Sequence, residues 1–557
     1  MKKYTCILIF SVFILGQSRL NAQLRERVYL QTDKQLYLTG ELLWIKMYTT
    51  DMDGKLTSFS KTGYVELIHD SIPEVQAKIE IRNGTGTGWM ELPTMIPTGY
   101  YRMKAYTRYM RNEGESTFFE KTICIVNPFA QGDLIESEET NTSFALKHFE
   151  KNAINANIAT GKQTYSKRSK GEIRLTGLPS ENISLGISIA GFDPVLEANT
   201  SIVEWKKQLP SNSTPFDNKR FLPEYEGEII EGVLIDQETG NPAYNKTNVT
   251  TLLTFPGDDI QLYSGKGDEN GNVTFFTQGA TGKQEFVTTS IDPFGGKYRV
   301  DIRSPYAVHT PIRLPIFRPD STWRDYLQKR NLSVQVAHAY TADSLSIIKK
   351  VEPLFNFQPY DRYMLDDYTR FTNMEELFIE FVRFVSIRRT NAGRRFTMHA
   401  EGLMNTTDNV LVLFDNIPII NHEVMCNYNP LNIKSIETHI GRYLFGGLLY
   451  DGITAFFSYK NDYPGITFDT ATQLFDYEGA QPYRFFYAPD YDELGETTRL
   501  PDFRHTLLWE PSLQTKGKNE LVLPFTTSYM SGKYLITVEG IGANGTIVYA
   551  NQMIEVE

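Results

Sequence analysis

Few positions in this sequence combine residue types and spacings that could do chemistry. His399 and Glu401 flank Ala400 with the spacing of half a catalytic zinc site, but no Pro-Cys-x-x-Cys segment supplies the remaining ligands. The Gly-x-Ser-x-Gly, His-Glu-x-x-His and phosphate-loop motifs do not occur either. We therefore expect no enzymatic active site, and we expect His399 to mark a strand that ends in a turn.

Two acidic turns and one glycine-rich segment could bind an ion. Segments 51–54 (Asp-Met-Asp-Gly) and 268–271 (Asp-Glu-Asn-Gly) begin like calcium loops, but Thr62 and Gly279 stand where such loops need a bidentate Glu. Both segments are therefore predicted to be hairpin turns. Segment 84–88 (Gly-Thr-Gly-Thr-Gly) has no helix after it, so it is not predicted to bind phosphate. No cofactor and no metal is predicted, although ligands from distant loops stay possible.

Clustered aromatic residues are the best candidates for a contact surface, because aromatic side chains anchor protein interfaces and stack on sugars. The alternative is that the same side chains fill the cores of β-sheets. Asp415 is added as a candidate at the turn of the 409–460 segment. The candidates for partner contact are Tyr106, Tyr109, Phe118, Phe119, Asp415, Tyr483, Phe485, Phe486 and Tyr487.

Length and charge narrow the class of protein. With 557 residues the chain is too long for one core, and domain-size statistics suggest roughly three to five units. Residues 1–22 are predicted to be a secretory signal peptide, with Lys2 and Lys3 before an apolar stretch and Ala22 at the cleavage site. Its removal, with Arg19, changes the net charge from −11 to −14. An acidic exported protein is a poor candidate for binding nucleic acid or an anionic membrane.

Neither a membrane helix nor a structural disulfide is predicted for the mature chain. No segment after the signal approaches the ~18–20 apolar residues of a membrane helix. Cys6 lies inside the signal, so no cysteine at the cleavage site suggests a lipid anchor. Cys124 and Cys426 fall in different predicted domains. We expect two buried free thiols, with a bridge as the alternative.

The stretch 409–460 contains three short apolar runs separated by turn residues. Asp415-Asn416 follows the first run, and a glycine-punctuated link precedes the third. Short apolar runs bounded by Gly, Pro, Asn and Asp predict strands joined by tight turns. The three runs cover 410–414, 433–440 and 453–459.

This stretch resembles the plug domain of TonB-dependent outer-membrane receptors. Residues 415–418 match the family's Asp-Gly-x-Pro with Asn416 in place of Gly, 432–437 match Asp/Asn-Ile-x-x-Ile-Glu, and 445–453 match Tyr-Gly-x-x-Gly-x-Ile. The resemblance implies a plug-like α+β domain over 351–465. Too few residues follow Lys460 to build a receptor-sized transmembrane barrel, whose strands each need about 9–11 residues.

The N-terminal part, 23–130, has short strand-like runs at hairpin spacing, which predicts a β-sandwich. It resembles the second macroglobulin domain of the α2-macroglobulin superfamily, whose Thr-Asp-Lys-x-x-Tyr-x-x-Gly-Glu turn precedes a long strand. Neither Cys124 nor Cys426 has the context of that family's thioester, so covalent protease trapping is not expected. The turn pattern is filled by Thr32, Asp33, Lys34, Tyr37, Gly40 and Glu41.

The remaining segments are predicted as further sandwiches and linkers. Residues 144–195 resemble a degenerate second macroglobulin-like domain, and 227–303 resemble the carboxypeptidase-regulatory type of sandwich, which commonly precedes a plug. Residues 466–557 repeat the spacing of the N-terminal sandwich and are predicted to be a last macroglobulin-like sandwich. Segments 196–226 and 304–350 are predicted linkers. A helix from Met374, capped by Thr372 or Asn373, is predicted from apolar spacing that runs to Val385.

Together these patterns predict a mostly β, multi-domain chain of sandwiches with one α+β plug-like domain. The leading functional hypothesis is a non-enzymatic cell-envelope interaction or scaffold protein of the periplasm, the outer membrane or the cell surface. Its partner would be an envelope protein, such as an outer-membrane barrel of a transport or secretion complex. The alternative is a soluble accessory protein that binds a glycan or peptide ligand.

Overall fold

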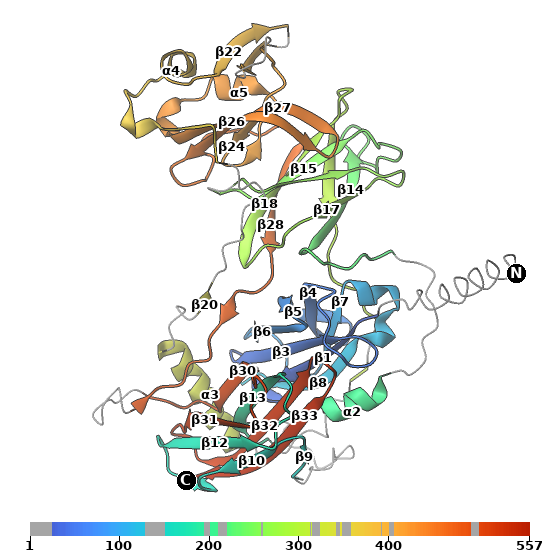
Figure 1. Cartoon of the computed structure of the whole chain (residues 1–557), viewed down its shortest axis with the longest axis vertical. Coiled ribbons are helices and arrows are strands. Elements are labelled where there is room, and N and C mark those ends of the chain that lie inside the picture. The colour runs from blue at the N-terminus through green and yellow to red at the C-terminus, as the bar shows by residue number, and fades with distance from the viewer. Residues whose placement is uncertain are drawn as a thin grey trace, which may run out of the picture. The chain divides into compact units, whose positions relative to one another are not determined.

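The computed structural model describes residues 25–128, 151–193, 201–209, 220–257, 260–311, 313–314, 324–340, 346–347, 358–391, 393–399, 406–491 and 501–557. The chain forms two compact units (Figure 1). Unit 1 comprises Met1–Tyr225, Ala307–Ile347 and Gln481–Glu557, and unit 2 comprises Glu226–Tyr306 and Ile348–Ala480. Several separate sheets dominate both units, so the predicted mostly β, multi-domain class is confirmed. The predicted signal peptide over 1–22 lies outside the described residues.

The first sandwich of unit 1 has the strand order β1-β3-β6-β5-β4-β7-β8-β2. Strand β5 joins its two sheets, since it pairs with β4 along most of its length and with β6 only at Ile81 and Arg82. At Gly86 a Cβ atom would lie 2.7 Å from the Glu80 carbonyl oxygen, so this crossing requires glycine. The strands are β1 Arg27–Thr32, β2 Leu36–Leu38, β3 Leu42–Thr50, β4 Thr62–His69, β5 Ile72–Arg82, β6 Thr85–Glu91, β7 Gly99–Thr107 and β8 Phe119–Val126, with short 3-10 helices η1 Tyr109–Asn112 and η2 Glu115–Thr117 before β8.

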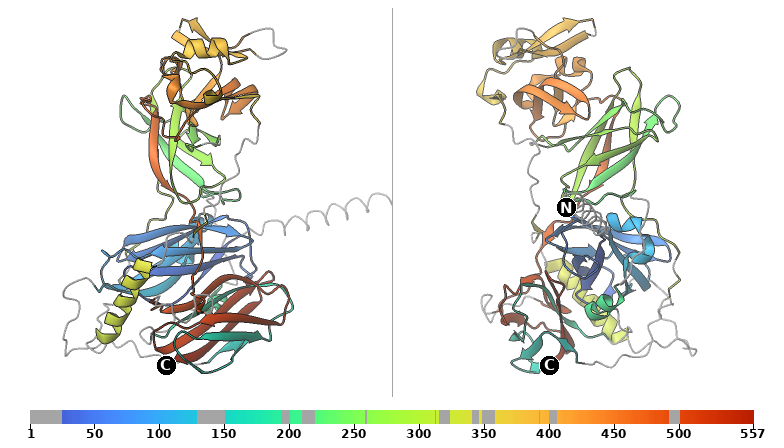
Figure 2. Two further views of the ribbon diagram at one scale, coloured as in Figure 1. Left: turned by 90° about the vertical axis from the view of Figure 1, so that its left-hand side faces the viewer. Right: turned by 45° about the vertical axis from the view of Figure 1, so that its right-hand side comes forward.

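Strands from two distant parts of the chain build the second sandwich of unit 1. One sheet has the order β10-β12-β31, the other β11-β33-β32-β13-β30, and β9 also pairs with β33. In both views of Figure 2 the teal and red segments lie side by side. The strands are β9 Ala153–Ile154, β10 Asn157–Thr160, β11 Thr164–Tyr165, β12 Lys170–Thr176, β13 Ile183–Gly191, β30 Thr506–Gln514, β31 Glu520–Thr526, β32 Gly532–Gly542 and β33 Ile547–Val556.

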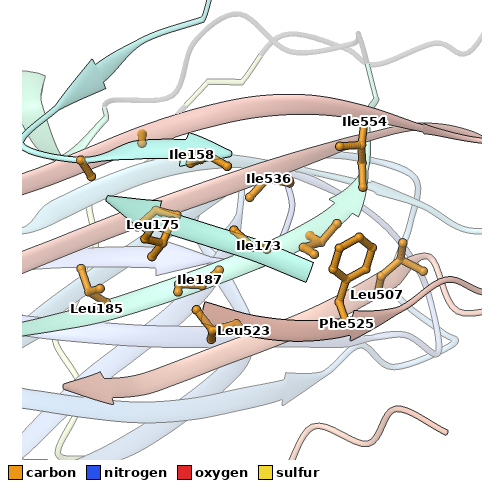
Figure 3. Packing of buried hydrophobic residues seen from close by; sticks show 14 of the residues in the cluster. Ile158, Ile173, Leu175, Leu185, Ile187, Leu507, Leu523, Phe525, Ile536 and Ile554 are labelled. Carbon is orange, nitrogen blue, oxygen red and sulfur yellow. The ribbon is translucent and has the colours of Figure 1, made fainter. Parts of the chain in front are cut away.

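This arrangement differs from the two separate domains expected over 144–195 and 466–557. The strands of the two ranges hydrogen-bond to one another, as in the pairs Ile173–Leu523 and Ile187–Val538. Their buried side chains form one cluster (Figure 3). Each range supplies strands to both sheets, and neither range has a complete sheet by itself, so the core closes only when the two ranges pair. The cluster includes Ile158, Ile173, Leu175, Leu185, Ile187, Leu507, Leu523, Phe525, Ile536 and Ile554.

Both predicted linkers contain a helix that packs on unit 1. Helix α2 (Ile202–Gln208) has a capping box between Ser201 and Glu204 and buries Trp205 against Tyr29. Helix α3 (Arg324–Tyr340) places Leu327 and Val334 in a cluster with strands β2 and β8. A two-residue pairing joins β20 (Ser346–Ile347) to β29 (Tyr483–Arg484).

Unit 2 begins with a sandwich of sheets β17-β14-β19 and β16-β15-β18-β28. Its edge strand β28 comes from the range predicted as the C-terminal sandwich, so that range divides between the two units at Ala480. The strands are β14 Ile229–Asp236, β15 Thr250–Thr254, β16 Leu262–Lys266, β17 Asn272–Phe276, β18 Lys283–Ile291, β19 Tyr298–Ile302 and β28 Thr472–Glu478.

The rest of unit 2 is an α+β domain with the sheet order β21-β26-β27-β24-β25 and a separate β22–β23 hairpin. Strands occur at all three predicted apolar runs. Asp415 and Asn416 both have positive φ, as the tight turn between β24 and β25 requires. The elements are β21 Asp361–Met364, η5 Leu365–Asp367, α4 Met374–Glu380, β22 Val385–Thr390, β23 Gly393–Met398, β24 Leu411–Phe414, β25 Ile417–Pro418, α5 His422–Cys426, η6 Pro430–Asn432, β26 Ile433–Phe445 and β27 Leu448–Ser458.

The predicted helix begins where expected and ends earlier. The Asn373 side chain caps α4 by accepting a hydrogen bond from the Glu375 amide. The helix ends at Glu380, and Val385 starts a strand instead. Its apolar spacing nevertheless marks buried positions, because Met374, Val385 and the residues between them at that spacing pack in one core. None of the helices in the described ranges is long and apolar enough to cross a membrane.

Candidate functional site

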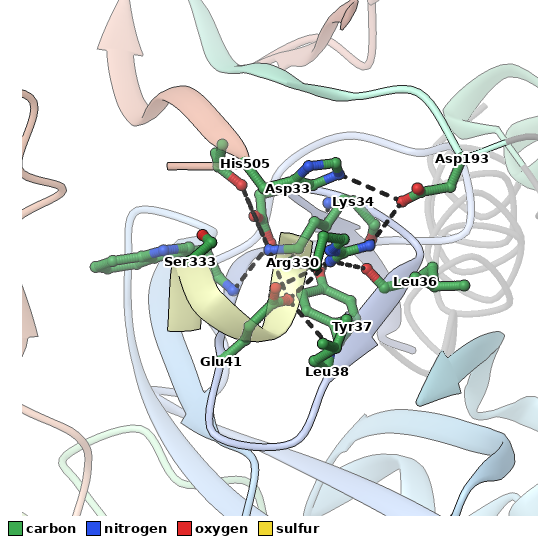
Figure 4. A network of polar contacts seen from close by, with 12 residues as sticks. Asp33, Lys34, Leu36, Tyr37, Leu38, Glu41, Asp193, Arg330, Ser333 and His505 are labelled. Carbon is green, nitrogen blue, oxygen red and sulfur yellow. Dashed lines mark hydrogen bonds and ion pairs between the residues drawn. The ribbon is translucent and has the colours of Figure 1, made fainter. Parts of the chain in front are cut away.

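The turn between β1 and β3 builds a buried polar network (Figure 4). Asp33 accepts hydrogen bonds from the Tyr37 hydroxyl at 2.7 Å, the Trp44 amide at 3.2 Å and the Thr506 hydroxyl at 2.7 Å. Lys34 lies 3.2 Å from Asp33. Lys34 also lies 3.4 Å from Glu41, so four charged or polar residues of the Thr-Asp-Lys-x-x-Tyr-x-x-Gly-Glu pattern meet in this network rather than at the surface.

Arg330 of helix α3 completes the network. Its buried guanidinium donates to both carboxylate oxygens of Glu41, at 2.9 and 3.0 Å, and to the Leu36 carbonyl at 3.0 Å. Its other nitrogen lies 3.2 Å from Asp193 at the end of β13. The guanidinium fork matches two carboxylates, which a lysine ammonium could not do in the same geometry.

The charges in this network favour the ionised acids. Burial alone would raise the pKa of Glu41, but Arg330 and Lys34 outweigh it and lower that pKa. Arg330 likewise overcomes burial and lowers the pKa of Asp193, to which Tyr326 donates its hydroxyl. Burial and the Arg330 charge lower the pKa of His505, so this imidazole is neutral near pH 7.

This network positions structural elements rather than reacting groups. It joins the first sandwich, the end of β13, helix α3 and the start of β30, which lie far apart in the sequence. Each carboxylate has a cation or several donors, so none is free to act as a base. In the described ranges no group of three or more His, Cys, Asp and Glu side chains could hold a metal ion.

A second buried network in unit 1 centres on His309. Its ring nitrogens lie 2.7 Å from Glu66 and 2.7 Å from Glu115. Lys104 is 2.6 Å from Glu115, and the Tyr106 hydroxyl donates to Glu66 at 2.5 Å. Burial opposes the charged imidazole, but the two carboxylates outweigh it and raise the His309 pKa. Burial opposes the Glu115 carboxylate in the same way, and bonds from Lys104, Thr310 and His309 lower its pKa to about 2.

The first aromatic cluster predicted as a contact surface is part of the core. Tyr106, Tyr109, Phe118 and Phe119 are all buried. Tyr106 stacks between Tyr64 and Phe118 at ring distances of 5.6 and 4.2 Å. The structure therefore corrects the contact assignment for these four residues, which lie on β7, in η1, directly before β8 and on β8, and are all covered by packing.

The second aromatic cluster is different. Tyr483, Phe485 and Tyr487 are exposed, while Phe486 turns toward Trp44 at 5.9 Å. Gln481 holds the segment on the edge of β6 by accepting from the Trp89 amide at 2.9 Å. Every second side chain consequently points to solvent.

Asp415 is fully buried, so it is not a contact residue in this structure. Its carboxylate accepts from the Ser458 amide at 2.6 Å, the Ser458 hydroxyl at 2.7 Å and the Tyr463 amide at 2.8 Å. Burial raises its pKa, and these bonds offset the rise in part. The residue closes the β24–β25 turn onto β27.

The other predicted sites behave as turns and core residues. Asp51 accepts from the Asp53 and Lys55 amides, and Asp268 accepts from the Asn270 and Asn272 amides. The first segment is a tight turn, whereas the second joins strands of two different sheets rather than a hairpin. The prediction of free, buried thiols at Cys124 and Cys426 is confirmed. His399 follows β23, and Glu401 lies outside the described residues.

Sequence reasoning missed Arg330, Asp193, His505 and His309. The only signal was the charged motif near Asp33, because two adjacent charges in a strand–turn element need partners when they are buried. Nothing local indicates that Arg330 stands 289 positions from Glu41, or that Thr506 stands 473 positions from Asp33.

Comparison with known proteins gives a limited likeness. No family model matches the chain, and no curated protein matches it. It is similar to solved α2-macroglobulin from Salmonella reacted with methylamine, at 9% identity and TM-score 0.23 over 95% of this chain and 39% of that chain. It is also similar to Escherichia coli α2-macroglobulin activated by porcine elastase, at 8% identity and TM-score 0.25 over 96% and 44%. The Escherichia coli adhesin FdeC matches at 9% identity and TM-score 0.15 over 49% and 62%.

The chain spans less than half the length of these macroglobulins. Scores of this size establish no shared activity. What the fold and the site define is a multi-domain, mostly β protein whose polar networks hold its elements together.

We expect Arg330→Met to lower the free energy of unfolding of unit 1 by about 3–5 kcal/mol, because Glu41 and Asp193 stay buried without their cation. All five tryptophans belong to unit 1, so tryptophan fluorescence during denaturation reports this unit. Arg174→Met is the matched control, since its exposed ion pairs contribute only ~0–1 kcal/mol. Adding Glu41→Gln to Arg330→Met should recover part of the loss. Equal free energies of unfolding for Arg330→Met and Arg174→Met would contradict this role of Arg330.

The His309 contacts predict a pH-dependent stability. A raised folded pKa means that His309 stabilises the fold fully below its unfolded pKa of 6.5 and loses this effect as the pH rises through the folded value. The lowered Glu115 pKa adds stability above about 4.5 that is lost toward pH 2. His309→Gln should therefore cost most between about pH 4.5 and 6.5, on the order of 1.5–3 kcal/mol, and less at pH 8. Tryptophan-monitored denaturation across this range tests it, and a constant difference would refute it.

Proposed function

We propose that the protein is an exported, non-enzymatic cell-envelope interaction or scaffold protein. In this proposal the 351–465 domain is plug-like and docks on an envelope protein, such as the barrel of an outer-membrane transport or secretion complex. The same proposal assigns types to the other domains. It takes residues 23–130 as macroglobulin-like, and likewise the joint sandwich of 151–193 and 506–556. Residues 227–303 are taken as the carboxypeptidase-regulatory type. Folds alone do not transfer a function, so the argument depends on a surface.

That surface lies around η5 and η6 in unit 2. Met364, Tyr368, Leu431 and Tyr459 are all exposed there, and we call them the η5–η6 surface. Two contacts bring Tyr459 and Leu431 to η5, which Met364 and Tyr368 flank: Tyr459 donates its hydroxyl to Asp366 at 2.6 Å, and Arg370 bridges Asp366 to the Leu431 carbonyl. Gathered, exposed large apolar side chains are a feature of protein interaction sites. This surface is the observation that carries the proposal.

Affinity purification of the tagged full-length protein from gently solubilised envelopes tests this function. We expect stoichiometric recovery of an outer-membrane barrel or secretion-channel protein. The double variant Met364→Ser, Leu431→Ser should lose that partner, whereas Met95→Ser, an exposed position of unit 1, should keep it. Recovery of the protein alone in the soluble fraction, or equal recovery with both variants, would overturn the proposal.

The exposed aromatic residues near β29 favour a second candidate function, the binding of a glycan or peptide ligand. Tyr483 and Phe485 lie close together, at a ring distance of 4.8 Å, and the Arg484 guanidinium stacks 4.8 Å from the Trp89 ring. Aromatic side chains that face solvent can stack on sugar rings.

A ligand bound at this aromatic segment should change the fluorescence of Trp89. We expect oligosaccharide titration of the full-length protein to give a saturable change that Tyr483→Ala with Phe485→Ala abolishes. Trp89→Phe should remove the signal without removing binding measured by calorimetry. A flat titration with a panel of envelope glycans and peptides would exclude this function.

A further inference from the structure

The β22–β23 hairpin carries four arginines in an unusual arrangement. The register sets Arg388 opposite Arg395 and Arg389 opposite Arg394. Like charges directly opposite one another on neighbouring strands destabilise a sheet. The whole chain is acidic, with a net charge of −11, so this basic cluster does not reflect the general composition.

Alternation along the strands places these arginines on two faces. Phe396 and Met398 turn into the core of the α+β domain, and Arg394 follows them on the same face. Arg388 and Arg395 lie on the opposite face. An anion near Arg388 and Arg395 would relieve the repulsion between them.

Arg394 shows how the hairpin satisfies an arginine. Its guanidinium binds Glu423 at 2.9 Å and Glu375 at 2.9 Å, two carboxylates from two different helices. Arg388, Arg389 and Arg395 make no ion pair or side-chain hydrogen bond with any described residue. Arg388 and Arg389 are exposed, and Arg395 is partly buried. Arg388 and Arg395 thus lack the carboxylates that Arg394 has. Arg389 makes no ion pair either, but its charge adds to the bonds from Arg394 that lower the pKa of Glu423.

The two outer edges of the hairpin also differ. On β23, the Arg394 amide donates to Glu423 at 2.7 Å and the Phe396 amide donates to His422 at 3.2 Å, so helix α5 occupies that edge. Burial, helped by the charge of Arg395, lowers the His422 pKa to about 4, which keeps this acceptor neutral.

No described strand pairs with the opposite edge, on β22. Arg394 and Phe396 point their amides outward, so their register partners Arg389 and Ile387 point theirs outward on the other side. Neither Arg389 nor Ile387 has a backbone partner on that side among the described residues. An open strand edge can accept an added strand from another chain.

We propose that the β22 edge binds an extended acidic segment of a partner polypeptide as an added third strand. Main-chain bonds at Ile387 and Arg389 hold the segment. Two consecutive acidic residues of the partner strand then point to opposite faces of the sheet. One faces Arg388, with Arg395 next to it on β23, and the other faces Arg389. A polypeptide is favoured over a phosphate or a lipid headgroup because only a strand uses both the open edge and the charges. This inference rests on the proposed function and specifies the chemistry of a partner.

A labelled synthetic peptide, Thr-Val-Glu-Glu-Val-Thr-Val, and the purified full-length protein test the proposal by fluorescence polarisation. We expect saturable binding that falls at least about fivefold with Arg388→Gln plus Arg389→Gln, through loss of two cross-strand charge pairs. Arg442→Gln, an exposed arginine elsewhere in unit 2, should leave binding unchanged. The Gln-Gln peptide should bind weakly. A peptide N-methylated at alternate backbone positions should also bind weakly, because it cannot extend the ladder.

Several outcomes would overturn the proposal. These are equal binding by the double arginine variant, equal binding by the N-methylated peptide, or stronger binding to inorganic phosphate or to phosphatidylglycerol vesicles than to the peptide. A second readout needs no ligand. Arg388→Gln should raise the thermal midpoint of the ligand-free protein slightly by removing a like-charge pair, whereas a lowered midpoint would indicate a structural role. Because the peptide assay uses no envelope partner, its result stands apart from the purification experiment.

Discussion

The buried ion network at Arg330 is the interaction on which the arrangement of unit 1 depends. Helix α3 packs on strands β2 and β8 through Leu327 and Val334, and the ion network adds polar contacts to this apolar packing. The bidentate pairing with Glu41, together with the Asp193 contact, fixes helix α3 and the end of β13 to the β1–β3 turn. A buried pair of this kind stabilises less than its Coulomb attraction suggests, because both ions lose water. Its effect is to make one arrangement of the elements far better than the others, since every alternative leaves a buried charge without a partner.

Unit 2 is held together by a different force. Leu252, Ile260 and Leu262 of its sandwich share an apolar cluster with Leu413, Phe445 and other residues of the α+β domain. Asn416 occupies the turn position at which the plug pattern has glycine, and its side-chain amide donates to the Gly257 carbonyl at 2.7 Å. The two parts of unit 2 therefore form one body. A partner that bound the η5–η6 surface or the β22 edge would engage a domain that is already packed, and less binding energy is spent where little ordering is needed.

Residue type alone did not identify the surfaces that could bind a partner. Tyr106 and Asp415 looked suited to recognition by residue type, and both proved to be buried with their polar atoms satisfied. Among the described residues, the outward amides of Ile387 and Arg389 have no backbone partner and Arg388 and Arg395 have no ion pair, while the η5–η6 surface exposes four large apolar side chains. Unsatisfied groups at a surface indicate a partner more reliably than residue type does, because a folded chain pairs its polar groups wherever it can.

The sequence by itself determined the local elements. Alternating apolar residues and turn signals predicted strands β24, β26 and β27, the turn at Asp415, the start of α4 at Asn373 and the inward character of the 374–385 pattern, because these depend on neighbours within a few positions. Only the tertiary structure decided that β12 pairs with β31, that β28 belongs to unit 2 and that Arg330 meets Glu41. Each of these contacts joins residues about 190 to 350 positions apart, and its energy depends on which strands and charges come together after the chain has folded. No periodicity in the sequence records that choice.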